Sequence, residues 1–391
     1  MRLTRLFNHF FHSEKSGGLV LIICTVASII LANSSFGPAY HHFWEIRLGE
    51  GSVEYWINDG LMTIFFLLIG LELEREVYIG ELSNIKNALL PIFGAIGGML
   101  LPAGVYLLFN YGTVTQPGAG IPMATDIAFA LAVLSLIGKR VPLSLKVFLT
   151  ALAVIDDLGA ILVIALFYSK GILWTNLLIA LGTWGLLLLF NRLKIRNLIP
   201  YILGGIVMWW FMLHSGVHAT ITGVLLAFAI PFGKGDTKST SYILQDFLHK
   251  PVAFIILPIF ALANTAIYIS PDFESLSTQP YSQGIALGLI IGKPLGILAS
   301  AFLAVKFKIC QLPSDLNWKL ILGAGCLGGI GFTMSIFIAL LAFDDPAIIN
   351  NTKLVILLAS LVSGALGFTL LQLFLKKSAA PDQSDVLIEK G

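Results

Sequence analysis

The chain has 391 residues, of which 57% are hydrophobic and only 12% are charged, with a formal net charge of +2. This composition lies far outside the range of soluble globular proteins and excludes a soluble core. So small a net charge also gives no reason to expect a nucleic acid as a partner. We therefore predict an integral membrane protein.

Apolar runs recur along the chain and are separated by short polar turns. Each run has about 17 to 25 residues, enough to cross the hydrocarbon layer as a helix. The sequence therefore predicts an all-α integral membrane protein with about 12 transmembrane helices. These helices are expected near residues 18–33, 56–79, 89–109, 119–137, 145–168, 173–190, 199–213, 217–231, 242–269, 284–305, 319–342 and 353–375.

The distribution of basic residues sets the orientation of the predicted spans. With the N-terminus in the cytoplasm, only Arg47, Lys170 and Lys353 fall on the outer side, a bias that the positive-inside rule requires. Both termini are therefore expected in the cytoplasm. The predicted organisation is a cytoplasmic N-terminal segment (1–17), a single transmembrane transporter domain (18–375) and a cytoplasmic polar tail (376–391).

A cluster of charged residues marks the inner end of the second predicted span. Glu72 and Glu76 lie one helical turn apart, with Arg75 beside them. Taken alone, these residues are equally compatible with a simple salt-bridge cluster at the membrane interface.

Two predicted spans carry signs of a helix break. In the fourth span, Pro122 removes a backbone donor and disturbs the preceding turn, so unpaired carbonyls are expected at membrane depth. Thr125 and Asp126 would line this break. In the eleventh span, five glycines occur between Gly323 and Gly331, which favours either a second break or close helix packing.

Two adjacent carboxylates, Asp156 and Asp157, lie near the midpoint of the apolar fifth span. Each costs roughly 2.5 to 3.5 kcal/mol at that depth, and ionisable residues inside a membrane are functional by default. Adjacent helical residues point about 100° apart, so one carboxylate is expected to face a cavity and the other a neighbouring helix.

Lys293 lies deep in the tenth predicted span, where neither a loop nor a span end can accommodate its charge. A buried ammonium group needs a counter-charge, and the carboxylates of Asp126, Asp156 and Asp157 are the candidates within spans. Interrupted fourth and eleventh spans are the pattern of an inverted-repeat transporter. Asp126 can neutralise the positive N-terminal ends of the half-helices, and Lys293 the negative C-terminal ends.

Five stretches together resemble the NhaA family of sodium/proton antiporters, in order and with matching spacing, and the similarity extends from about residue 5 to residue 375. The stretches are Ala124-Thr-Asp-Ile-Ala-Phe-Ala130, Ala151-Leu-Ala-Val-Ile-Asp-Asp-Leu-Gly-Ala160, Ser215-Gly-Val-His-Ala-Thr220, Ile291-Gly-Lys-Pro-Leu-Gly296 and Gly329-Ile-Gly-Phe-Thr-Met-Ser-Ile-Phe337.

The resemblance implies twelve spans, crossed discontinuous fourth and eleventh helices, and a location in the bacterial inner membrane. It also implies that Asp157 is the principal ligand for the cation and that Asp156 pairs with Lys293, while Asp126 compensates helix ends. Carboxylates and a hydroxyl such as that of Thr125 are the hard oxygen ligands that a small alkali cation needs.

A site that holds either protons or Na+, combined with alternating access, gives antiport. The expected activity is electrogenic export of Na+ or Li+ against external H+, with a contribution to sodium and pH homeostasis. The resemblance points to no enzymatic reaction and no cofactor.

Regulation by pH is a further implication of the resemblance. The family's cytoplasmic pH-sensing funnel matches Glu72, Arg75, Glu76, His218 and His249. The pair His214 and His218 has helical spacing but no third metal ligand in view. The loop 34–53, with glycines between short β-prone pieces, could form an external hairpin that pairs two protomers, or simply connect two spans.

Two other classes of protein use similar elements. An intramembrane aspartyl protease needs two carboxylates at membrane depth, but on separate helices with a Gly-x-Gly-Asp motif that this sequence lacks. A sodium-coupled organic-anion symporter would share the broken helices, but should carry more polar side chains for its substrate. The small number of polar side chains within the spans favours an inorganic ion.

Overall fold

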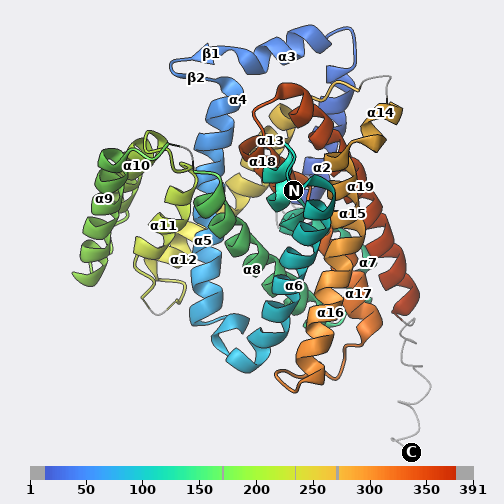
Figure 1. Ribbon diagram of the computed structural model, residues 1–391. Coiled ribbons are helices and arrows are strands. Elements are labelled where there is room, and N and C mark those ends of the chain that lie inside the picture. The colour runs from blue at the N-terminus through green and yellow to red at the C-terminus, as the bar shows by residue number, and fades with distance from the viewer. Residues whose placement is uncertain (1–13, 170, 234, 270–272, 376–391) are drawn as a thin grey trace, which may run out of the picture.

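The computed structural model describes residues 14–169, 171–233, 235–269 and 273–375. Most of the N-terminal segment 1–17 and all of the tail 376–391 that the sequence set apart lie outside these residues. In the part that is described, the chain is helical apart from one two-stranded hairpin (Figure 1). The all-α prediction is confirmed.

The elements of the first half are α2 (Glu14–Ala32), α3 (Gly37–Glu45), β1 (Arg47–Leu48), β2 (Gly51–Ser52), α4 (Val53–Trp56), η1 (Ile57–Leu61), α5 (Met62–Tyr78), η2 (Glu81–Ser83), α6 (Ile85–Asn110), η3 (Gln116–Met123), α7 (Ile127–Ile137), η4 (Gly138–Arg140) and α8 (Leu143–Phe167). Those of the second half are α9 (Trp174–Arg192), α10 (Ile199–Leu213), α11 (Ile221–Ala229), α12 (Thr240–Pro251), η5 (Val252–Ile256), α13 (Leu257–Asn264), α14 (Phe273–Thr278), α15 (Pro280–Leu287), η6 (Gly288–Gly292), α16 (Lys293–Lys306), α17 (Trp318–Gly328), α18 (Phe332–Ala342) and α19 (Pro346–Phe374).

Within the described residues, eight helices are long and apolar enough to cross a membrane, and up to ten spans result if each of two bent pairs counts as one. Each of the twelve predicted segments corresponds to helical structure. Two of the twelve predicted segments, 199–213 and 217–231, are not among these ten spans because their helices are short. Helix α10 has 15 residues and α11 only 9. At 1.5 Å per residue, α11 is about 14 Å long, half the thickness of the hydrocarbon layer.

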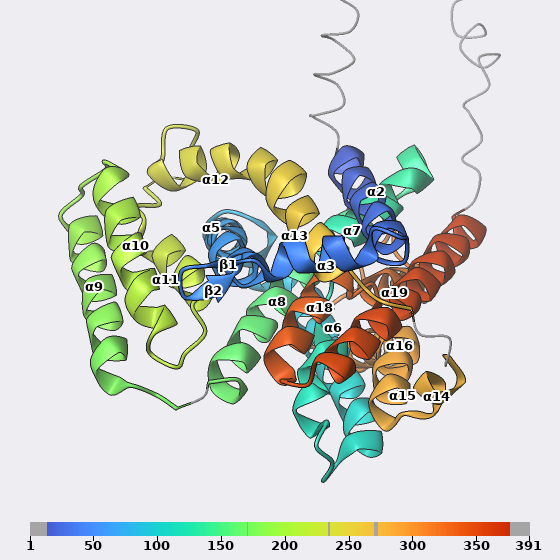
Figure 2. The ribbon, with the colours of Figure 1, turned by 90° about the horizontal axis from the view of Figure 1, so that it is seen from above.

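The helices form two groups with α8 between them (Figures 1 and 2). On one side α5 packs against α11, and α9 packs against α10. On the other side α6 packs against α16, and α17 packs against both α16 and α19. Helix α8 contacts α6 and α5, so a residue in its centre lies between the two groups.

Small residues bring α6 and α16 into close contact. A side chain at Gly296 of α16 would place its Cβ 2.2 Å from the carbonyl oxygen of Gly97 in α6. Glycine allows such close backbone approach between helices in membranes. Helix α16 begins at Lys293, and this contact at Gly296 holds the helix against α6 about one turn after Lys293.

The segment 34–53 contains α3, and its last part forms a short antiparallel hairpin, in which Arg47 lies opposite Ser52 and Leu48 opposite Gly51. Of the two alternatives for this loop, a hairpin or a simple connection, the hairpin is therefore present. It is held to the helices by the Trp56 indole, which donates to the Leu48 carbonyl at 2.7 Å.

His214, at the end of α10, also holds this hairpin. One ring nitrogen lies 3.1 Å from the Glu50 carboxylate and the other 2.8 Å from the carbonyl oxygen of Trp210. The hydrogen bond to Trp210, together with Glu50, raises the pKa of His214 above the ordinary value of 6.5. The protonated ring can donate to both partners.

We expect the attachment of the hairpin to weaken as the pH rises. A raised pKa means that the contact is complete below the ordinary histidine value and is lost as the pH rises through the raised value. Hydrogen–deuterium exchange at residues 47–52, after correction for intrinsic rates, should therefore become faster over that interval. Glu50→Gln should remove most of this pH dependence, and an unchanged profile in that variant would contradict the assignment.

Candidate ion-binding site

Two breaks in the helices meet in the centre of the molecule. One is the extended stretch 124–126 between η3 and α7, and the other is the stretch 329–331 between α17 and α18, which are bent by 49°. The backbone N–H of Asp126 donates to the Ile330 carbonyl at 2.7 Å. The hydroxyl oxygen of Thr125 lies 2.8 Å from the Gly328 carbonyl oxygen. The discontinuous fourth and eleventh helices that the sequence predicted are therefore present and in contact.

The glycines of the eleventh span are needed because other chain segments pass close to the break. A Cβ on Gly329 would lie 2.4 Å from the Leu289 carbonyl of η6. The sequence offered two explanations for this glycine run, a helix break and close helix packing. The structure shows both. A larger residue at this position would push η6, and Lys293 after it, away from the centre.

Asp126 is buried at the point where two half-helices begin. Its carboxylate accepts hydrogen bonds from the backbone N–H of Phe129 at 2.9 Å and from that of Thr333 at 3.2 Å. The Thr333 hydroxyl donates to the same carboxylate at 2.5 Å. One negative charge thus faces the N-terminal ends of both α7 and α18, where a negative charge is favourable.

We expect Asp126→Ala to destabilise the protein by on the order of 3 kcal/mol, because it removes three hydrogen bonds to a buried charge and leaves N–H donors without a partner. The change is measured as a loss of thermal stability in detergent. The control is Asp345→Ala, which removes an exposed cap at the start of α19 and should cost about 1 kcal/mol. Equal losses in the two variants would show that Asp126 is an ordinary helix cap.

Asp156 and Asp157 are both 1% exposed, but their surroundings differ. One oxygen of Asp156 accepts from the Thr125 hydroxyl at 2.7 Å and lies 2.6 Å from the ammonium group of Lys293. Neither carboxylate oxygen of Asp157 has a hydrogen-bond partner among the described residues. The two adjacent carboxylates of α8 therefore have different surroundings, as expected for side chains that point in different directions from one helix.

Lys293 is completely buried. Besides the contact with Asp156, its ammonium group donates to the carbonyl of Met123, the last residue of η3. A positive charge thus faces the C-terminal end of a half-helix, opposite in sign to the arrangement at Asp126.

The centre of the molecule brings together three buried carboxylates, those of Asp126, Asp156 and Asp157, and one buried ammonium group, that of Lys293. If all four groups ionise, negative charge exceeds positive charge in a medium that tolerates little net charge. Bound protons or a bound cation can remove the excess. Both Asp157 oxygens and the second oxygen of Asp156 have no hydrogen-bond partner in the described structure, so they have free capacity to accept either one.

Of the pH-sensing candidates, four lie at one end of α5. The His249 ring is 3.7 Å from the Glu72 carboxylate. The guanidinium group of Arg75 stacks over the ring of Tyr242 at 4.9 Å, and Glu76 accepts from the backbone N–H of Glu81 at 3.0 Å. These contacts join the C-terminal half of α5 to α12 and to η2.

His218 is not part of this group, so the expectation that placed it there requires correction. It lies 3.4 Å from Asp59, and Glu72 follows Asp59 by 13 residue steps along the helical span, which amounts to about 20 Å. The physical reason is that the turn before α11 brings His218 to the opposite end of the α4–α5 span.

The sequence did not identify Thr333 as a residue of the site. Its hydroxyl and its backbone N–H both donate to Asp126. The available signal was symmetry, because Thr333 follows the break of the eleventh span much as Thr125 lies in the break of the fourth. The carbonyl of Met123 carried no such signal, since every residue has a carbonyl group.

Residues 8–371 match the family described as Na+/H+ antiporter 1. The chain is 70% identical to a Na+/H+ antiporter NhaA of Flavobacterium psychrophilum, over 97% of this chain and 98% of the relative. It is 60% identical to the antiporter of that name from Cytophaga hutchinsonii (96% and 97% covered) and 48% identical to Na+/H+ antiporter NhaA 2 of Clostridium beijerinckii (92% of both covered). Matches of this extent include both helix breaks and the buried carboxylates, and the chain belongs to the NhaA family of Na+/H+ antiporters.

Proposed function

We propose that this chain exchanges Na+ for H+ across the membrane, with Asp156 and Asp157 as the ion-binding carboxylates. The observation that carries the proposal is the buried, unpartnered carboxylate of Asp157, one residue away from the Asp156–Lys293 ion pair. The names of the relatives support the choice of ions.

In this mechanism Asp157 is the principal ligand, and the carboxylate of Asp156, the Thr125 hydroxyl and freed carbonyls near the breaks complete the oxygen shell. Asp126 and Lys293 hold the ends of the half-helices at the crossing. Protons and the cation need the same oxygens, so binding of one displaces the other. Alternating access then couples entry of H+ from outside to release of Na+ there.

The role of Lys293 determines the electrical balance of the exchange. When a cation binds Asp156, the carboxylate no longer stabilises the ammonium group, and Lys293 can release its proton. With a second proton from Asp157, two protons move for each Na+, and one net charge crosses the membrane per cycle. Li+, a smaller hard cation, suits the same oxygen ligands.

Everted membrane vesicles that contain the full chain test the exchange directly. Adding Na+ or Li+ should dissipate a preformed pH gradient, whereas K+ and vesicles without the protein should give no response. Absence of a response to Na+ from mildly acidic to alkaline pH would refute antiport. In proteoliposomes, valinomycin with K+ on both sides should accelerate the exchange if it is electrogenic.

Regulation and location form part of the same proposal. Glu72, Arg75, Glu76 and His249 are the candidates for pH sensing at the cytoplasmic end of α5, and His218 would act separately beside Asp59. A single transmembrane domain (18–375) in the bacterial inner membrane, with cytoplasmic termini, agrees with the distribution of basic residues. Homodimers would form through the 47–52 hairpin, and deletion of that hairpin should then shift the purified protein to monomers.

A further inference from the structure

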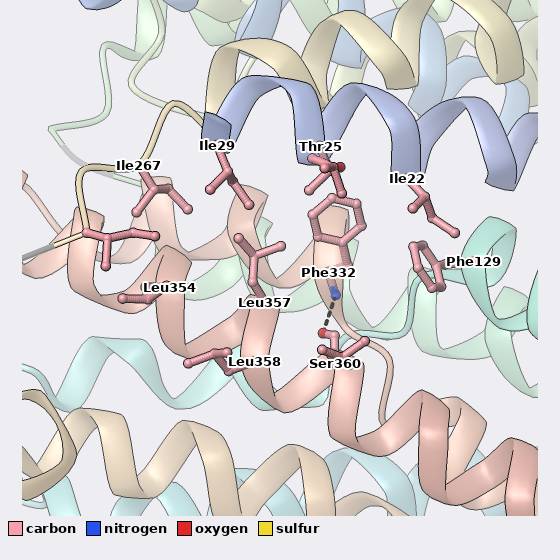
Figure 3. A pocket seen from close by; sticks show the side chains of 13 residues that line it. Ile22, Thr25, Ile29, Phe129, Ile267, Phe332, Leu354, Leu357, Leu358 and Ser360 are labelled. Atoms are coloured by element: carbon pink, nitrogen blue, oxygen red, sulfur yellow. Dashed lines mark hydrogen bonds between the residues drawn. The ribbon is translucent and has the colours of Figure 1, made fainter. Parts of the chain in front are cut away.

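A cavity of about 300 Å³ lies between α2 and α19, outside the ion-binding site (Figure 3). Its lining on α2 extends from Ile22 to Ile29, and its lining on α19 from Leu354 to Leu361. Each stretch covers seven residue steps, or about 10 Å along the helix axis. The cavity, which we call the α2–α19 slot, is therefore elongated parallel to the two helices.

The slot lies at the depth of the hydrocarbon layer. Residues 22–29 extend from the centre of α2 (Glu14–Ala32) into its C-terminal half, and residues 354–361 occupy the first half and centre of α19 (Pro346–Phe374). Several lining side chains also form part of the outer surface: Val26 is 50% exposed, Leu358 40% and Leu361 69%. In a membrane, the surrounding medium at this opening is acyl chain.

The lining of the slot offers no place for water or ions. None of its residues is charged, and its polar side chains are those of Thr25 and Ser360. The Thr25 hydroxyl already donates to the Leu21 carbonyl at 2.8 Å, and Ser360 already accepts from the backbone N–H of Phe332 at 3.1 Å. A water molecule needs two to four polar partners, so a cavity of this kind favours an apolar occupant.

We propose that the α2–α19 slot binds one acyl chain of a membrane phospholipid. The chain enters sideways from the bilayer and lies along the two helices, so that its apolar surface replaces an unfilled space between them.

The position of the slot connects this lipid to the crossing of the broken helices. Phe129 and Phe332 line it, with ring centroids 5.8 Å apart in an edge-to-face arrangement (Figure 3). The backbone N–H of Phe129 donates to Asp126, and Phe332 directly precedes Thr333, whose hydroxyl also donates to Asp126. The bound chain therefore packs against one residue in the first turn of each of α7 and α18, and it supports the half-helices that Asp126 holds together.

The test uses the full chain in vesicles of phosphatidylcholine and phosphatidylglycerol. A small fraction of the phosphatidylcholine carries a photoreactive diazirine group at the end of one acyl chain. After illumination, mass spectrometry locates the modified residues. We expect Ile29 and Phe129 to be labelled about tenfold more than exposed apolar residues outside the slot, an enrichment equivalent to burial of about two methylene groups.

Two pairs of matched variants separate a bound lipid from the general lipid shell. Val26→Trp and Leu358→Trp fill the slot, whereas Ile23→Trp and Leu366→Trp place the same side chain on the same helices at similar exposure, outside the lining. We expect the first two to reduce labelling of Phe129 by about tenfold and the second two to leave it unchanged. The two slot-filling changes lie on different helices, so a folding defect in one leaves the other as a test.

Uniform labelling of all exposed apolar residues would overturn the proposal, because it would show only the general lipid shell. Equal labelling of Phe129 in slot-filling and control variants would also overturn it. Labelling of the slot that falls as the protein-to-lipid ratio rises would assign the slot to a second copy of the chain instead.

Discussion

Asp157→Asn is expected to abolish sodium-dependent proton movement while the protein remains folded in the membrane. The substitution removes a charge that no described hydrogen bond or ion pair compensates. Loss of one buried carboxylate opposite a bound cation costs about 3 to 5 kcal/mol, which weakens cation binding by on the order of 100-fold or more. Exchange is measured in everted vesicles as recovery of a pH gradient after addition of Na+.

The adjacent residue offers a matched comparison for this prediction. Asp156→Asn keeps the hydrogen bond from Thr125 in reach but leaves the Lys293 ammonium group without its charged partner. We therefore expect Asp156→Asn to lower thermal stability clearly, whereas Asp157→Asn should leave it unchanged or raise it, because an unpaired buried charge disappears.

The reverse order of stabilities would show that Asp157 is a structural residue. Substantial exchange by Asp157→Asn would exclude Asp157 as the principal ligand. Asp315→Asn, an exposed position that accepts from Ser144, controls for effects of the substitution itself and should exchange normally.

The sequence could predict charge partners better than their exact geometry. Because few charges occur within the spans, the possible partners of Lys293 were limited to Asp126, Asp156 and Asp157, and the resemblance to the family, not the residues alone, singled out Asp156. The carbonyl of Met123 could not be predicted as a partner of Lys293, because this contact depends on where η3 ends. Propensity gives such boundaries only to within a few residues.

The misplacement of His218 has a related cause. The sequence gives the region from residue 217 to residue 231 as one apolar run, but α11 begins only at Ile221. The preceding turn passes through Gly216 at a φ of 83°, a conformation that glycine adopts readily. The direction in which this turn carries His218 is decided by packing of α11 against α5, which is a tertiary property.

Lys293→Met is expected to destabilise the protein by about 3 to 5 kcal/mol, because it leaves the buried Asp156 without its charged partner and the Met123 carbonyl without its donor. Thermal unfolding in detergent measures this loss. Lys353→Met provides a control, since Lys353 is also largely buried but pairs at 3.4 Å with the partly exposed carboxylate of Glu54. Its expected cost is about 1 kcal/mol.

The double variant Lys293→Met with Asp156→Asn separates pairing from the loss of each group. If the two residues stabilise the fold mainly through each other, the double variant should regain most of the stability that Lys293→Met loses, since replacing both members of a buried ion pair is often nearly neutral. Stability losses that simply add would show that Lys293 acts through the carbonyl of Met123 instead.

The electrical behaviour of Lys293→Met distinguishes a structural lysine from one that carries a proton. Without the ammonium group, and with Asp156 ionised throughout the cycle, only the proton on Asp157 remains to be exchanged for each Na+, and the net charge moved per cycle falls from one to zero. We expect any residual exchange in this variant to be insensitive to valinomycin and K+. Acceleration by valinomycin comparable to that of the unmodified chain would instead assign the second proton to a group other than Lys293.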